Sequence, residues 1–104
     1  MEDMKTFRVY QIRKNVDDRY YKVFEPYDRL IKHFGKVDFN DYHCIYKGLC
    51  KKESKLDDIY RMCNLNHPVG YAGHSLSVSD IVDMDGKYYY CDSVGWKELD
   101  IQHD

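Results

Sequence analysis

The alternation of hydrophobic and polar side chains predicts two strands and one helix in the first half of the chain. Residues 5–12 alternate well enough for a strand and end where the sequence turns polar, and residues 42–49 predict a second strand. Between them, apolar residues recur at helical spacing from Tyr27 to Phe34, and Gly35 follows where a C-terminal cap is expected. We therefore expect a short amphipathic helix whose apolar side lies on a sheet.

Proline and capping residues define two further segments. Residues 20–24 predict extended chain or a short turn, because Glu25 precedes a proline and is disfavoured in the helical conformation. A second helix is predicted from Ser54 as N-cap and Asp57 three residues later. Its apolar positions at helical spacing are Leu56, Ile59, Tyr60 and Cys63.

The C-terminal third predicts a β-hairpin. Asp85 and Gly86 are typical of a two-residue type I′ turn, which would pair Met84 with Lys87. The same register places Val82, Met84, Tyr89 and Cys91 on one face of the hairpin and Ile81, Asp83, Tyr88, Tyr90 and Asp92 on the other. The register also pairs Asp80 with Cys91 at the far end of the hairpin. A last strand is predicted over residues 96–101.

These elements predict a single α+β domain over residues 1–104, a small antiparallel sheet of four to five strands with two short helices packed on it. A chain of 104 residues supports one modest hydrophobic core and no separate catalytic domain. The pattern does not determine the order of the strands in the sheet.

Charge and composition narrow the function classes. Sixteen Lys and Arg against eighteen Asp and Glu give a net charge of -2, so we expect no direct sequence-specific nucleic-acid binding. The mean hydropathy of -0.74 coexists with eleven tyrosines, which predicts a folded domain with a tyrosine-rich surface. With no membrane-length apolar run and no signal-peptide pattern, we expect a cytoplasmic protein that does not bind membranes. The four cysteines are expected to be free thiols in or near the core.

The serine-rich stretch from His74 to Asp80 carries the most concentrated polar chemistry. We favour a structural loop in which Ser77, Ser79 and Asp80 bond to nearby backbone groups, with Tyr71 beside it and Asp80 joined to Ser93 across the hairpin. The alternative is a small hydrolase or ligand-binding protein that uses His74, Ser77 and Asp80. A glycine-flanked nucleophile motif is missing from the sequence, which favours a non-enzymatic protein.

The sequence also contains residue types that can bind a metal. Cys63, His67, His74 and Cys91 are suitable zinc ligands, but the Cys63 and His67 pair has no matching second pair in the sequence. The helical spacing of Cys63 and the hairpin position of Cys91 favour core packing instead. We therefore expect neither a metal nor a cofactor.

The consecutive tyrosines of the hairpin predict an interaction surface. A strand must direct Tyr89 to one face and Tyr88 with Tyr90 to the other, and tyrosine is favoured at interfaces. The expected partner-binding residues are Asp83, Tyr88, Tyr90, Asp92 and Trp96. Such a face is expected to contact a host protein, or a second copy of the chain in a homodimer.

The segments Gly73 to Val82 and Tyr89 to Trp96 resemble the YodL-like domain family, small proteins and modules of conjugative elements and prophage-derived regions. The resemblance covers about residues 56–101 and implies no common enzymatic activity. It implies a setting in which small proteins bind and disable host machinery. The expected function is a non-enzymatic inhibitor of a host defence effector, of the anti-CRISPR or antirestriction type, acting by surface occlusion. Regulation of another host cytoplasmic protein is the alternative.

Overall fold

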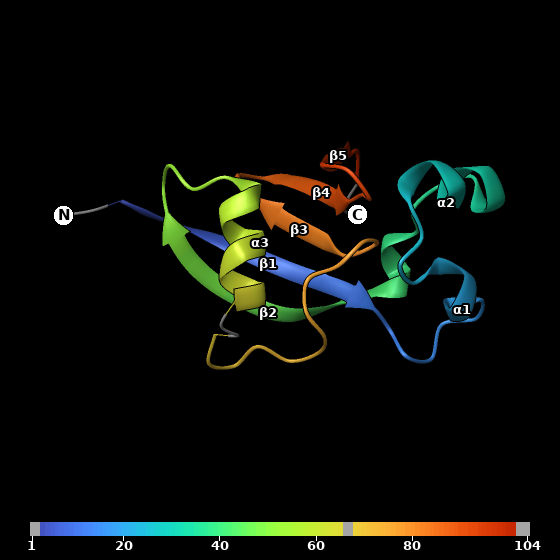
Figure 1. The fold of residues 1–104 in the computed structure, drawn as a ribbon, viewed down its shortest axis with the longest axis horizontal. Helices are drawn as coiled ribbons and strands as arrows, with labels where there is room; N and C mark the ends of the chain where they lie inside the picture. The colour runs from blue at the N-terminus through green and yellow to red at the C-terminus, as the bar shows by residue number, and fades with distance from the viewer. Residues whose placement is uncertain (1–2, 66–67, 102–104) are drawn as a thin grey trace.

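A five-stranded antiparallel sheet is the frame of the fold (Figure 1), in a computed structural model that describes residues 3–65 and 68–101. The strands are β1 (Met4–Ile12), β2 (Tyr42–Lys51), β3 (Ile81–Met84), β4 (Lys87–Cys91) and β5 (Trp96–Leu99). The helices are α1 (Arg19–Lys22), α2 (Tyr27–Phe34) and α3 (Leu56–Leu65), with a short 3-10 helix η1 (Phe39–Asp41). The predicted α+β class is confirmed.

The strand order is β2-β1-β3-β4-β5, so β1 is paired on both sides. The hairpin register is confirmed, with Met84 opposite Lys87 and Val82 opposite Tyr89. Both turn residues have positive φ, 58° for Asp85 and 78° for Gly86, as a type I′ turn requires. The pairing of β3 with β1 joins segments about 70 residues apart and had no local sequence pattern to predict it.

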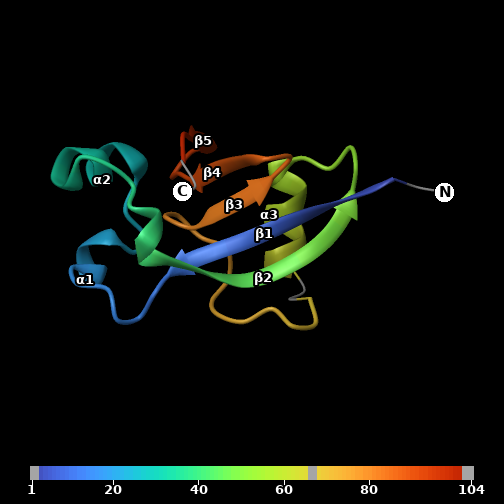
Figure 2. The same cartoon turned by 180° about the vertical axis from the view of Figure 1, so that it is seen from behind.

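Each face of the sheet has its own hydrophobic cluster. On one face, α3 packs its buried Ile59 and Cys63 against Phe7, Val9 and neighbouring strand residues. On the opposite face, the cluster lies at one end of the sheet, where α2 contributes Leu30. Figures 1 and 2 show α3 lying across the first face of the sheet. They also show α1 and α2 beyond the C-terminal end of β1. The apolar side of the predicted first helix therefore packs against the end of the sheet.

Two local predictions are corrected. Residues 19–22 form the helix α1, where extended chain or a turn was expected, because Asp18 adopts a left-handed conformation (φ 62°) that starts the helix ahead of Pro26. The backbone N–H of Lys55 donates to Asp58 at 2.8 Å, so the capping pair is one residue later than Ser54 and Asp57.

The cysteines are free thiols in the part of the chain that is described, but Cys44 is exposed, whereas the other three are buried. Cys44 lies on β2, an edge strand of the sheet, and its thiol donates to the Tyr46 carbonyl at 3.4 Å. Within residues 3–65 and 68–101, no helix has the length and apolar character needed to cross a membrane.

Candidate functional site

The loop between α3 and β3 is bound to the sheet through one buried side chain, Gln11 near the end of β1. The Gln11 amide nitrogen donates to the His74 carbonyl at 2.8 Å and to an Asp80 carboxyl oxygen at 3.0 Å. Tyr71 donates its hydroxyl to the same His74 carbonyl at 2.9 Å. The structure therefore brings Tyr71, His74 and Asp80 together around a residue of the first strand that sequence reasoning missed.

Asp80 is the most deeply buried titratable group of this loop, with 1% of its surface exposed. Its Oδ2 accepts from the Gln11 amide and from the Ser77 backbone N–H at 2.9 Å, and lies 3.9 Å from His74 Nδ1. Burial raises the pKa of Asp80 to about 8, although the two hydrogen bonds act to lower it. The carboxyl group is therefore mostly protonated in the folded chain at neutral pH.

Side chains from β2 and α3 fix the loop backbone further. The Tyr42 hydroxyl donates to the Ser79 carbonyl at 2.6 Å, inside the core. Asn64 of α3 makes two hydrogen bonds with Leu76, donating to its carbonyl at 2.9 Å and accepting from its N–H at 2.7 Å. The loop backbone is thus bonded to side chains of both β2 and α3.

The hydroxyls of Ser77 and Ser79 bind backbone groups. Ser77 Oγ donates to the Ser75 carbonyl at 2.9 Å, and Ser79 Oγ accepts from the Phe24 N–H at 2.9 Å. His74 Nδ1 lies 2.7 Å from the Ser75 carbonyl and 3.2 Å from Gln11 Nε2, so its neighbours are a backbone carbonyl and an amide rather than the Ser77 hydroxyl. These contacts support the structural interpretation of the loop over the hydrolase one.

The predicted lock between Asp80 and Ser93 is wrong. Ser93 is exposed, and its N–H donates to the adjacent Asp92 carboxylate at 2.8 Å. The two strands are instead joined here by backbone bonds, from Ser79 N–H to the Cys91 carbonyl and from Cys91 N–H to the Asp80 carbonyl. The second of these bonds extends the hairpin pairing to Asp80 and Cys91, as the register predicted.

Of the four candidate zinc ligands, Cys63, His74 and Cys91 lie within the described residues. Cys63 and Cys91 are buried, and burial raises the pKa of their thiols to about 11 and about 12, whereas zinc takes thiolates. His67 lies outside the described residues. Across residues 3–65 and 68–101, no three His, Cys, Asp or Glu side chains lie together as a set of metal ligands.

The loop passes close to Gln11 at Gly73, so Gly73→Ala should destabilise the fold. Gly73 has φ +99°, and a Cβ there would lie 2.4 Å from Gln11 Oε1, on a side chain whose amide nitrogen makes two hydrogen bonds. We expect a loss of about 2–3 kcal/mol in unfolding free energy from backbone strain and overlap combined. Urea unfolding of both proteins measures it.

Gly70→Ala is the matched control for this substitution. Gly70 has a similar φ of +90° but open space around the position of a Cβ. It should lose only the strain contribution, about 1 kcal/mol. Equal losses in the two variants would show that the contact between the loop and Gln11 is not tight.

Tyr90 does not lie on a surface, contrary to the prediction. Its side chain is 0% exposed, and its hydroxyl donates to the backbone carbonyl of Glu25. The ring contacts Tyr27 of α2 edge-on, with centroids 5.5 Å apart. The alternation placed Tyr90 on the correct face of the sheet, but the hairpin alone could not show that α2 covers this end.

The other predicted partner-binding residues remain partly accessible, and each has a structural contact. Asp83 accepts from Arg8 at 3.1 Å, and the ring of Tyr88 packs edge-on against Phe39. Asp92 accepts from the Tyr27 N–H at 3.0 Å and so caps the start of α2. Trp96 packs against the α3-side cluster, away from the tyrosine face. The predicted set is therefore divided between the two faces of the sheet.

A family model described as the YodL-like domain matches residues 6–101 of the chain. The chain belongs to the YodL-like domain family. The match includes most of β1 and all of β2, where the sequence resemblance covered only about residues 56–101. No curated protein and no solved structure matches the chain. The match shows which family this domain belongs to and assigns no activity to any residue.

The most exposed aromatic side chains of this YodL-like domain lie in and after α1, a segment that sequence reasoning left without a role. Tyr20 is 87% exposed, Tyr21 63% and Phe24 57%; we call these three residues the α1 aromatic patch. The rings of Tyr20 and Tyr21 meet edge-on, and the Phe24 ring lies 5.5 Å from that of His74. The sequence signal that could have identified this patch is a pair of adjacent tyrosines in a polar run.

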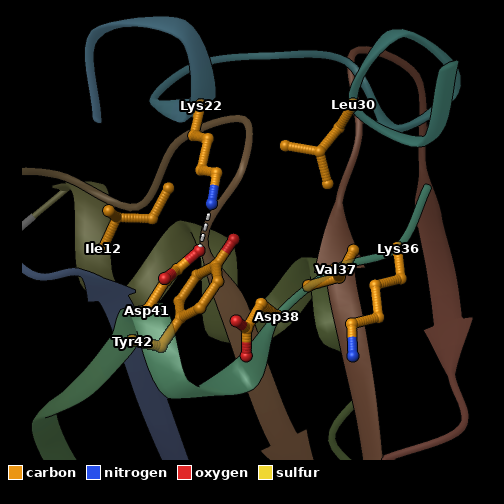
Figure 3. A pocket seen from close by; sticks show the side chains of 8 residues that line it. All are labelled: Ile12, Lys22, Leu30, Lys36, Val37, Asp38, Asp41 and Tyr42. Carbon is orange, nitrogen blue, oxygen red and sulfur yellow. Dashed lines mark hydrogen bonds and ion pairs between the residues drawn. The ribbon is translucent and has the colours of Figure 1, made fainter. Parts of the chain in front are cut away.

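The α1 segment is anchored by a partly buried ion pair. Figure 3 shows the Lys22 ammonium pointing to the Asp41 carboxylate, at 2.6 Å, below α1. Ile12 and Leu30 form the apolar side of the same cavity. Its volume is about 10 Å³, room for a single water molecule. The ion pair at this cavity therefore anchors α1, and the cavity itself is too small for a ligand.

Proposed function

We propose that this YodL-like domain is a non-enzymatic protein-binding module that inhibits a host defence effector, of the anti-CRISPR or antirestriction type, by covering a surface of it. The α1 aromatic patch is the observation that carries the proposal. Large aromatic side chains dominate interface energetics, and three of them are displayed here on one short segment. The helix α1 has four residues and none of them is buried, so the exposed rings contribute little to the stability of the helix.

The backbone that holds Phe24 is strained, which supports a functional role. Phe24 has φ 64°, a left-handed conformation that is a genuine outlier for a bulky residue. The conformation persists because the Phe24 N–H donates to the buried Ser79 and because Lys22 is fixed by Asp41. An aromatic group held in place before binding loses less entropy on binding, which favours its use as an anchor.

The charge of the whole chain favours a protein over a nucleic acid as partner. The chain carries a net charge of -2, whereas nucleic-acid-binding domains usually have a basic excess. Around the patch itself the charges are of both signs, since Asp17 and Asp18 precede α1 and Arg19 and Lys22 lie in it. The family's setting on mobile elements makes a defence protein of the host the favoured target, and a different cytoplasmic protein the alternative.

Replacing the two exposed tyrosines is expected to abolish inhibition without unfolding the domain. Tyr20→Ser with Tyr21→Ser removes about half or more of the exposed ring area while changing unfolding free energy by about 0.5 kcal/mol or less, because neither residue is buried. Host cells with active CRISPR or restriction immunity would express the wild type or the double variant. Phage plating efficiency should rise with the wild type only.

Leu49→Ser is the matched control, since Leu49 is an exposed apolar residue (63%) on β2, a different element. It should protect phages as well as the wild type does. Protection by the double tyrosine variant would remove the aromatic patch from the proposal. Lack of protection by the well-expressed wild type against every immunity system of the host would refute the defence target.

A further inference from the structure

A second candidate binding feature lies on the α3 side of the sheet, around the single tryptophan. An open hollow of about 220 Å³ is formed between the first turns of α3 and the turn that joins β4 to β5. Its lining includes Asp57, Tyr60, Asp92 and Trp96. Two carboxylates and two aromatic rings line it, and no Lys, Arg or His is among these lining residues.

The two aromatic rings form a corner with a fixed geometry. The rings of Tyr60 and Trp96 are 83° from parallel, with centroids 6.5 Å apart. Trp96 packs against the core cluster and donates its indole N–H to Asp57 at 3.3 Å, so its ring cannot turn freely. Tyr60 is 42% exposed and leaves ring surface toward solvent. A cation placed in this corner can contact the face of at least one ring.

The charges near the hollow also favour a cation. The N-terminus of α3 contributes a positive partial charge of about half a unit, which alone would disfavour one. Asp57 and Asp58 lie in that same first turn, and Asp92 lines the opposite side, so the formal negative charge is the larger. Asp92 Oδ1 is directed by hydrogen bonds from the N–H groups of Tyr27 and Ser93, which fixes the carboxylate in place.

We propose that this hollow binds an arginine side chain of the partner protein. The planar guanidinium can stack on an aromatic face and donate to a carboxylate at the same time, whereas a lysine ammonium offers only a point charge. The proposal rests on the protein-binding function above and adds a contact separate from the α1 aromatic patch. It also predicts that the partner presents an exposed arginine, which the hollow binds.

Fluorescence of Trp96 can report binding at the hollow directly, because the chain contains only one tryptophan. The probe is a capped tripeptide with arginine between two glycines, titrated up to several millimolar while Trp96 fluorescence is recorded. The neutral control peptide carries citrulline in place of arginine. We expect a saturable change with the arginine peptide, weakened by added salt, and none with the citrulline peptide.

Variants test the two halves of the site. Asp57→Asn should weaken binding of the arginine peptide about tenfold through loss of a charge-assisted hydrogen bond. Tyr60→Ala should weaken it about threefold through loss of one ring. Asp17→Asn removes the same charge from an exposed position outside the lining of the hollow and should leave binding unchanged.

Three results would overturn the proposal: no fluorescence change with the arginine peptide, an equal change with the citrulline peptide, or full binding by Asp57→Asn. The result is independent of the phage assay, which measures the function of Tyr20 and Tyr21. Peptide binding without phage protection would leave the arginine site standing and refute the defence role alone.

Discussion

Tyr90→Asp is expected to unfold the domain. The Tyr90 ring is completely buried between the sheet and α2, and truncating such an aromatic side chain costs about 3–5 kcal/mol. The new carboxylate would add the cost of placing a charge in an apolar site, several kcal/mol more. Circular dichroism at room temperature should show loss of native structure, since small domains are commonly stable by only about 5–15 kcal/mol.

Tyr90→Phe is the control for this prediction. It keeps the ring and removes only the hydroxyl that donates to the Glu25 carbonyl, at a cost of about 1–2 kcal/mol. The variant should fold and unfold cooperatively at a somewhat lower temperature. A folded Tyr90→Asp with an unchanged melting temperature would contradict the burial of this side chain. Loss of partner binding in Tyr90→Asp would therefore report unfolding, not a lost contact.

The stability of the wild type is expected to fall as the pH rises toward 8, because of Asp80. Burial raises the pKa of Asp80 to about 8 in the folded chain, against about 3.9 when unfolded. Between these values the folded state holds a proton that the unfolded state has released, so raising the pH favours unfolding. Above the folded pKa both states are ionised and the dependence ends. From about pH 6 to about pH 8, this contributes a loss of about 2 kcal/mol.

Asp80→Asn isolates the contribution of this carboxyl group. The amide keeps the size of the side chain and an oxygen that can accept from the Gln11 amide and the Ser77 N–H, but it does not titrate. Urea unfolding at several pH values should give curves for the two proteins that diverge over this range. His74, which lies 3.9 Å from Asp80, is present in both proteins. Parallel curves would refute the raised pKa of Asp80.

The hydrogen bonds around Asp80 bear on the enzymatic alternative as well. In a hydrolase, a buried carboxylate orients an imidazole that accepts the proton of a serine. Here the Ser77 hydroxyl donates to a backbone carbonyl, and His74 Nδ1 lies closer to the Ser75 carbonyl than to Asp80. The same residue types that predict chemistry in a sequence therefore also suit a loop that must satisfy its own backbone.

The most exposed aromatic side chains lie in and after α1, not on the hairpin. Period-two alternation correctly separated Tyr89 from Tyr88 and Tyr90, but it assigns residues to a face without showing what covers that face. At the far end of the sheet, α2 covers Tyr90. Tyr20 lies in a helix that begins after the left-handed residue Asp18, a conformation that no apolar pattern reports.

The sequence by itself determined the hairpin, the two longer helices and the family. The Asp85 and Gly86 turn, the hairpin register, and the apolar spacing of the two longer helices depend on residues a few positions apart, and short-range geometry fixes them. The resemblance at the serine-rich loop likewise identified the YodL-like family.

Only the tertiary structure decided the strand order, the burial of Tyr90 and the partner of Asp80. Gln11 and Asp80 are 69 positions apart, and their hydrogen bond forms only because β3 pairs with β1 in the centre of the sheet. Contacts at such separation depend on which apolar faces cover one another, a property of the whole chain rather than of any segment. For the same reason, Tyr60 of α3 and Trp96 of β5 form an aromatic corner that neither segment predicts alone.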